Sequence, residues 1–227
     1  VIFGLIGVNP GRGLYTYFVQ PLTAAWSIKD LIVKMTPLLL IGVGLAICYL
    51  ANTWNIGAEG QFALGGIFAA FIPVYFPHAG GPAIVIAMLL LGILGGMLWA
   101  AIPAALKVRF GTSEILTSLM LVYIAQLLLD WVARSPWRDP QGHNFPNSRP
   151  FSPDQMLPSI LGTRLNFYIA IVVAIGAWFM LKNMLTGFQI RVLGQAPRAG
   201  SFAGFSQSRM ILLAFLISGA LAGLEPG

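Results

Sequence analysis

The chain has 227 residues, of which 57% are hydrophobic and 9% are charged, and its mean hydropathy is +0.81. Soluble domains carry about 25% charged residues, so the composition excludes an ordinary soluble domain. The net charge of +6 is spread over several polar segments without a basic stripe, which argues against nucleic-acid binding. A single cysteine excludes an intramolecular disulfide or a cysteine cluster for a metal.

Apolar runs of membrane-spanning length follow one another along the chain. At about 20 residues per span, about six to seven spans fit, and the runs lack the alternation of β-barrel strands. The predicted fold is an all-α, polytopic transmembrane helical bundle. Both ends fall in or near apolar runs, so we expect residues 1–227 to be a single transmembrane domain cut at both ends from a longer protein. The predicted spans are Val1–Phe18, Met35–Ala51, Phe62–Phe76, Ala83–Leu106, Ile115–Trp131, Leu165–Leu181 and Met210–Leu224.

A polar break separates two of these runs over Asn52–Gly66, which reads NTWNIGAEGQFALGG. Polar side chains next to apolar spans usually face a bundle interior or a cavity. Asn55 suits a helix N-cap, which places Glu59 in the first turn of the next helix, where the helix dipole favours an anion. We therefore predict a broken helix near residues 52–61. Spacing alone leaves open a short hairpin turn at the membrane surface.

Glycine pairs at GxxxG spacing occur in two of the predicted spans. Gly92 and Gly96 form one pair, and Gly219 and Gly223 form the other. Small residues one turn apart let helix backbones approach closely in lipid. The pattern predicts close helix packing at both places.

Two polar segments are long enough to carry function. Residues 132–164 are rich in proline, and residues 186–205 read TGFQIRVLGQAPRAGSFAGF. In the second segment, Pro197 suits the first position of a short helix and Gly204 its left-handed C-terminal stop. Such a helix can dock on a soluble partner, or it can be a basic loop whose arginines reach lipid phosphates. Basic residues are almost equally frequent in the two sets of loops, so charge alone leaves the orientation open.

Four segments occur in a recognisable order: Asn55–Gln61 (NIGAEGQ), Gly111–Ala125 (GTSEILTSLMLVYIA), Gly187–Gly204 and Ile217–Leu224 (ISGALAGL). Together they resemble the permease subunit of bacterial ABC importers in the branched-chain amino acid, sugar and nucleoside permease family. The NIGAEGQ form is most similar to the nucleoside and simple-sugar members.

The resemblance implies a multi-pass permease of the bacterial inner membrane that moves a small polar solute by alternating access. It implies that 132–164 is a periplasmic loop and 186–205 a cytoplasmic coupling segment. The expected partners are an ATP-binding subunit that holds ATP and Mg, a second permease subunit, identical or related, and a periplasmic solute-binding protein. The chain itself is expected to hold no cofactor or metal and to have no catalytic residue.

The resemblance also implies roles for individual residues. Those expected along the translocation pathway are Asn55, Glu59, Gln61 and Glu114. Those expected to couple the chain to the ATPase are Gly187, Ile190, Arg191, Gly194, Pro197, Ala199, Phe202 and Gly204.

Without the resemblance, the residues themselves also allow other functions. No lysine follows a glycine as a P-loop requires, so the energy must come from a partner or from an ion gradient. One alternative is an ion-coupled secondary transporter that uses Glu59 or Glu114, and another is a branched-chain amino acid importer. A membrane enzyme is disfavoured because His78 and His143 fall in predicted loops and no HExxH pattern occurs.

Overall fold

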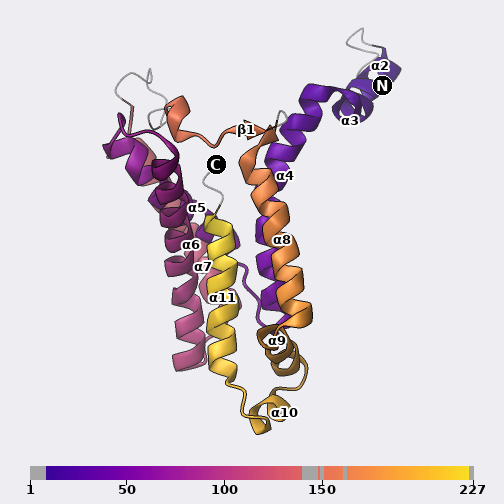
Figure 1. Cartoon of the computed structure of the whole chain (residues 1–227), viewed down its shortest axis with the longest axis vertical. Coiled ribbons are helices and arrows are strands. Elements are labelled where there is room, and N and C mark those ends of the chain that lie inside the picture. Colours follow the sequence, from indigo (N-terminus) through magenta and orange to yellow (C-terminus); the bar gives the residue numbers. More distant parts are fainter. Residues whose placement is uncertain (1–8, 140–147, 149–150, 161–162, 225–227) are drawn as a thin grey trace.

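The computed structural model describes residues 9–139, 148, 151–160 and 163–224, and helices make up most of it (Figure 1). Within these residues the only strands are β1 (Ser159–Ile160) and β2 (Thr163–Arg164), which pair antiparallel. The predicted all-α bundle is therefore confirmed. The long helices are α4 (Ala25–Leu50), α5 (Ala58–Tyr75), α6 (Pro82–Phe110), α7 (Glu114–Arg134), α8 (Leu165–Asn183) and α11 (Gln207–Gly223).

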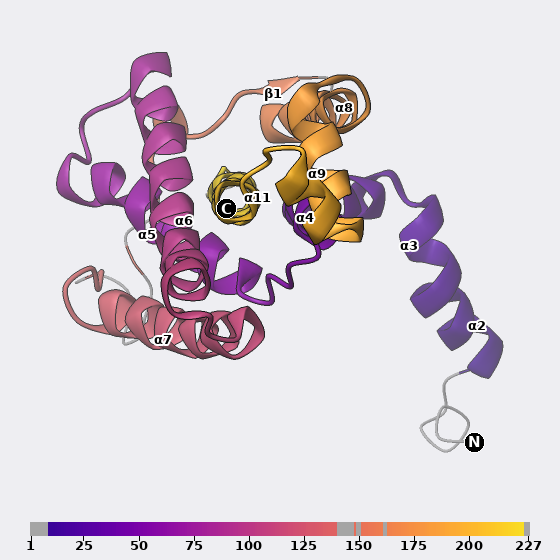
Figure 2. The same cartoon turned by 90° about the horizontal axis from the view of Figure 1, so that it is seen from below.

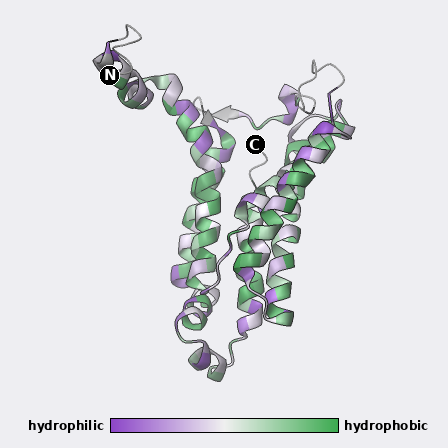
Figure 3. Ribbon diagram, turned by 180° about the vertical axis from the view of Figure 1, so that it is seen from behind, coloured by the Kyte–Doolittle hydropathy of each residue, from purple (hydrophilic) through white to green (hydrophobic). Residues whose placement is uncertain are grey.

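Four of these helices, α4, α6, α7 and α8, are long and apolar enough to cross a membrane. The apolar helix α11 is shorter, with 17 residues, and α5 begins with a polar first turn. Hydrophobic residues cover the helices along most of their length (Figure 3). The described residues thus contain six bundle helices, which agrees with the lower end of the predicted number of spans.

The N-terminal region differs from the predicted first span. Residues 1–8 of that span lie outside the described residues. The rest of that span forms the short helix α2 (Pro10–Leu14) and most of the π-helical turn η1 (Tyr15–Val19), and the short helix α3 (Gln20–Thr23) follows. These elements project from the bundle as an arm (Figures 1 and 2). A proline near the start of both α2 and α3 and an extended Ala24 before α4 divide this segment into short pieces.

Glycines form the contact between α6 and α11. A β-carbon at Gly96 would collide with the carbonyl oxygen of Gly219, and one at Gly92 would collide with that of Gly223. Side chains larger than hydrogen would therefore hold the two backbones apart. The close packing predicted from both GxxxG pairs is confirmed.

Helix α11 lies between two groups of helices. It packs on α5 and α6 on one side and on α4 on the other, and α8 packs on α4 (Figure 2). Its Ala214 joins a buried cluster with Ile47 and Cys48 of α4. Since α11 contacts both groups, it holds the bundle together beside the polar break.

The described parts of the two long polar segments lie at opposite ends of the bundle (Figure 1). The turn η2 (Pro153–Gln155) packs at one end, where buried Gln155 donates a hydrogen bond of 2.8 Å to the carbonyl of Ala79. At the other end lie α9 (Leu185–Gln195) and α10 (Pro197–Phe202). Between α6 and α7, Gly111 adopts a left-handed φ of 66° and Ser113 caps α7, so the chain reverses there in a few residues.

Candidate functional site

The polar break is a non-helical stretch that runs from the end of α4 back into the protein. Helix α4 ends at Leu50, and Asn52 adopts a left-handed φ of 53°, which asparagine tolerates. Thr53 is buried, and both its N–H and its hydroxyl donate to the Cys48 carbonyl at 3.0 Å. Helix α5 starts at Ala58, so the predicted interruption near residues 52–61 is confirmed. Thr53, Asn55 and Gly57 of this stretch are buried, whereas Asn52, Trp54 and Ile56, which alternate with them, are exposed.

Asn55 and Gln61 form a buried amide cluster with Ser218 of α11. The Asn55 Nδ2 donates to Gln61 Oε1 at 3.0 Å and to Ser218 Oγ at 2.9 Å. Its Oδ1 accepts from Gln61 Nε2 at 3.0 Å and from the Gly57 N–H at 3.1 Å. Both donors and both acceptor positions of the Asn55 amide are therefore used. All three side chains are at most 1% exposed. We call Asn55, Gln61 and Ser218 the amide cluster.

The N-cap predicted at Asn55 is wrong. The residue that precedes α5 is Gly57, and no side chain caps it. Asn55 instead accepts a hydrogen bond from the N–H two residues ahead, which is an Asx turn inside the break. The Asn55 side chain points inward because Ser218 of α11 accepts its hydrogen bond, and the local sequence gives no sign of this distant partner. Glu59 lies in the first turn of α5, as expected.

Glu59 does not join the amide cluster. Its side chain is exposed, and its Oε1 accepts a hydrogen bond of 2.9 Å from Gln126 Nε2 of α7. Residues two positions apart in a helix point in nearly opposite directions, so Glu59 and Gln61 leave α5 on different sides. Gln126 was not among the predicted site residues.

Glu114 stands apart as the first residue of α7. It is buried, and its carboxylate forms an ion pair of 2.5 Å with Lys107 of α6. It also accepts a hydrogen bond of 3.4 Å from the N–H of Trp54 in the break. Glu114 therefore ties the end of α6, the start of α7 and the break together.

The four predicted pathway residues thus fall into three separate groups. Asn55 and Gln61 are buried in the interior, Glu114 is paired at the turn between α6 and α7, and Glu59 is exposed beside Gln126 of α7. Their role in translocation stays a prediction.

The segment predicted to couple to a partner forms α9 and α10. Pro197 occupies the first turn of α10, and Gly204 has a left-handed φ of 82° just after it. Both positions agree with the prediction for a short helix. Helix α10 protrudes from the end of the bundle (Figure 1), and Phe202 is 93% exposed. Phe202 borders a shallow concavity shared with Pro197, Arg198, Ser201 and Gln207.

The remaining coupling residues hold this segment in place. Ile190 is fully buried beside Ile47 and Cys48 of α4. A β-carbon at Gly194 would collide with the carbonyl oxygen of Leu50, and one at Gly187 would crowd the end of α8. Helix α9 is therefore fitted tightly against the bundle.

Helix α10 displays the other predicted residues. Ala199 and Phe202 are exposed, whereas Arg191 is half-buried on α9. The backbone of Gly200 packs on the side chain of Leu193, which anchors α10 to α9. The predicted set thus divides into residues that fix α9 and residues that α10 presents outward.

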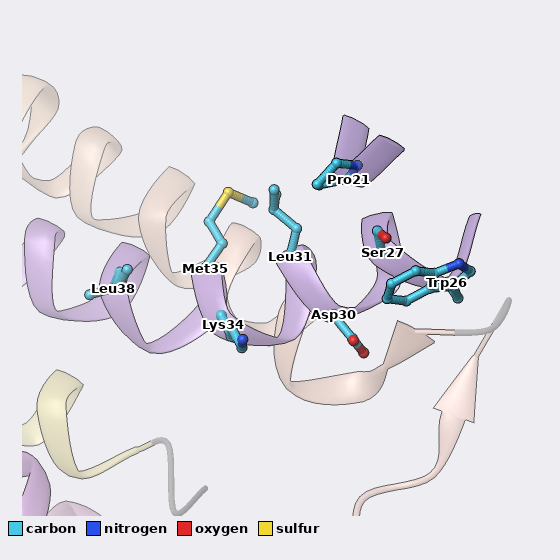
Figure 4. A pocket seen from close by; sticks show the side chains of 8 residues that line it. All are labelled: Pro21, Trp26, Ser27, Asp30, Leu31, Lys34, Met35 and Leu38. Atoms are coloured by element: carbon cyan, nitrogen blue, oxygen red, sulfur yellow. The ribbon is translucent and has the colours of Figure 1, made fainter. Parts of the chain in front are cut away.

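A groove lies at the opposite end of the bundle, between α3 and the start of α4 (Figure 4). Leu31, Met35 and Leu38 give it an apolar wall, and the hydroxyl of Ser27 is buried there without a hydrogen-bond partner. None of the predicted site residues lines this groove.

Among the described residues, no three His, Cys, Asp or Glu side chains gather where they would hold a metal ion. His143 lies outside the described residues. His78 is exposed in the turn between α5 and α6.

Comparison with known proteins gives a consistent result over most of the chain. A family model described as "Branched-chain amino acid transport system / permease component" matches residues 27–225. The glucose ABC transporter permease protein TsgB13 of Haloferax volcanii is 30% identical over 96% of the chain and 60% of its own length. The guanosine ABC transporter permease protein NupP of Bacillus subtilis is 30% identical over 87% of the chain and 58% of its length.

A third relative is the nucleoside ABC transporter permease protein NupB of Lactococcus lactis, which is 28% identical over 99% of the chain and 64% of its own length. The chain therefore spans about 60% of the length of these curated relatives. No solved structure matches the chain.

Proposed function

Because the chain belongs to the branched-chain amino acid transport system permease family, we propose that it is the membrane-spanning subunit of an ATP-driven ABC importer. The solute is small and polar, with a nucleoside or a simple sugar favoured. The names of three relatives, for glucose, guanosine and nucleosides, support this solute class over branched-chain amino acids. The protein is a multi-pass membrane protein, and we place it in the bacterial inner membrane.

The observation that carries the proposal is the contrast between α9 and α10. Helix α9 is fitted against α4 by Ile190 and Gly194, whereas α10 protrudes and exposes 93% of Phe202. An anchored α9 followed by a protruding α10 with an exposed aromatic residue suits docking on a partner, because aromatic residues that become buried at an interface dominate its binding energy. A movement of the partner there would be passed to α4 and α11.

We propose three partners that fit this arrangement. A separate ATPase subunit, which binds ATP and Mg, would take up α10 on the cytoplasmic side. A solute-binding protein would meet the proline-rich segment 132–164 on the periplasmic side, and the position of η2 at the opposite end from α10 supports this assignment. A second permease subunit, identical or related, would complete the path. Conformational coupling then requires only that nucleotide favours one state of the bundle over the other.

Replacement of Phe202 tests the coupling role. We expect Phe202→Ala to lower ATP-driven solute uptake at least about ten-fold, because an aromatic interface anchor is removed, with membrane insertion unchanged. The measurement is uptake of a panel of nucleosides, pentoses, hexoses and branched-chain amino acids into proteoliposomes of the assembled transporter, with ATP hydrolysis recorded in parallel. The matched control is Phe110→Ala, which removes a phenyl ring 68% exposed at the end of α6. Normal uptake by the Phe202 variant would refute the coupling role.

The ion-coupled alternative is not favoured by the structure. Glu114 is buried in an ion pair with Lys107, and Glu59 is held by Gln126. Uptake that continues without ATP and stops when an uncoupler is added would establish that alternative.

A further inference from the structure

One flank of α7 carries several polar side chains from the middle of the helix to its C-terminal end, and the exposed Leu127 lies among them. Tyr123, Gln126 and Asp130 follow one another at spacings of three and four residues, which places them on one side of a helix. Tyr123 is 58% exposed, and the other two are exposed as well. Asp130 pairs with Arg134 at 2.6 Å, and Glu59 of α5 extends the set through its hydrogen bond with Gln126. We call Glu59, Tyr123, Gln126, Asp130 and Arg134 the polar stripe.

The opposite flank of α7 is apolar at the same depth. Met120, Ile124 and Leu128 follow one another at four-residue spacing, and all three are exposed. Gln126 and Ile124 differ by two residues and point about 160° apart around the helix. At this depth the side chains on one flank of α7 are therefore polar and those on the other are apolar, and the apolar flank suits contact with lipid.

The depth of Gln126 makes lipid an unsuitable neighbour for the polar stripe. Gln126 lies twelve residues after Glu114, where α7 begins, and eight before Arg134, where it ends. At 1.5 Å per residue these distances are about 18 Å and 12 Å, so Gln126 and its partner Glu59 lie deep within the span. A carboxylate at such depth faces a water-filled cavity or another protein group.

We propose that the polar stripe is a water-filled wall of the solute path and that Glu59 and Gln126 bind the solute on it. This inference rests on the proposed transport function. The described contacts use one oxygen of Glu59 and the amide nitrogen of Gln126. The second oxygen of Glu59 and the amide oxygen of Gln126 are acceptors suited to hydroxyl donors. The negative charge of Glu59 disfavours solutes that carry a carboxylate. The site therefore selects neutral polyhydroxylated solutes, such as a sugar or the ribose of a nucleoside.

Thiol labelling of the assembled transporter in the native membrane tests this wall. The single native cysteine, Cys48, is fully buried, so the unaltered chain gives the background. Gln126→Cys and Ile124→Cys are each exposed to a charged, membrane-impermeant thiol reagent, which reacts with the thiolate in water. We expect the Gln126 variant to react at least about ten-fold faster than the Ile124 variant. A saturating neutral hexose or nucleoside should slow its reaction, whereas a carboxylate-bearing amino acid should not.

Tyr123→Cys is a second probe on the same flank, used where the Gln126 variant is not inserted in the membrane. Equal, slow labelling on both flanks would overturn the proposal. So would oxidative crosslinking of two Gln126→Cys copies without labelling, because that result assigns the stripe to an interface between subunits. Labelling does not require ATP. If labelling is fast and slowed by solute but uptake does not need ATP, only the proposed importer function is refuted. If labelling is slow but uptake is driven by ATP, only the proposed water-filled wall is refuted.

Discussion

The amide cluster and the Glu59–Gln126 pair come from the same short motif and have opposite environments. Asn55 and Gln61 are at most 1% exposed and use their amide groups on each other and on Ser218. Glu59 lies between them in sequence, is exposed, and has the side chain of Gln126 as its partner. A polar residue in a membrane protein can either stabilise the packing of helices or bind the transported solute, so residue type alone does not assign its role. Burial and the number of satisfied hydrogen bonds separate the two cases.

The difference has an energetic basis. A buried amide whose hydrogen bonds are all made fixes the backbone around it, whereas removing one partner leaves the others unpaired at about 1–3 kcal/mol each. An exposed pair in a water-filled path loses little stability when it is changed, because water replaces the missing partner. The cluster should therefore determine stability, and the pair should determine transport.

The largest effect is expected from Asn55→Leu. This change leaves the Gln61 amide, the Ser218 hydroxyl and the Gly57 N–H without their partner, so we expect the free energy of unfolding to fall by about 2–4 kcal/mol. Thermal unfolding of the purified protein in detergent measures the loss. Gln126→Leu is the matched control, because it makes the same amide-to-alkyl change at an exposed position and should alter stability by less than about 0.5 kcal/mol. Equal destabilisation by both variants would remove the distinction between cluster and pair.

An intermediate effect is expected from Gln126→Leu on transport. Loss of the amide removes a hydrogen bond to the solute and leaves Glu59 without its partner, so we expect ATP-driven uptake to fall about ten-fold, equivalent to about 1.4 kcal/mol. Initial uptake rates at several solute concentrations give the measurement. Ile124→Ala, on the apolar flank of the same helix, should transport normally. Full uptake by the Gln126 variant would show that the polar stripe does not bind the solute.

Sequence reasoning predicted those features that depend on local pattern. Apolar runs predicted the helical bundle and the interruption after Leu50. The backbone preferences of glycine and proline predicted the glycine contacts between α6 and α11 and the start and stop of α10 at Pro197 and Gly204. The first span differed because prolines divide residues 9–24 into short helices that leave the bundle.

The grouping of the site residues depended on partners distant in sequence. Asn55 meets Ser218 across 163 positions, and Glu59 meets Gln126 across 67. Neither contact has a local signal in the sequence, so the predicted pathway set joined residues with different surroundings. A signal for Gln126 was nevertheless available, because it is an isolated amide in the apolar run Ile115–Trp131, and such residues usually face a bundle interior or a cavity.

The smallest effect is expected from Glu59→Gln, which separates solute binding from ion coupling. The substitution keeps the shape and an acceptor oxygen of the side chain but removes its charge. If Glu59 only accepts hydrogen bonds from a neutral solute, ATP-driven uptake should fall no more than about two-fold, because one charge-assisted hydrogen bond becomes an ordinary one. A carrier that moves a proton or cation on Glu59 would instead lose all uptake, because an amide neither binds nor releases a proton at neutral pH.

Initial uptake rates with and without an uncoupler decide between the two outcomes, and Glu59→Asp, which keeps the charge on a shorter side chain, is the matched control. Complete loss with the Gln variant and activity with the Asp variant would show that the Glu59 charge, and not its hydrogen bonding, drives transport.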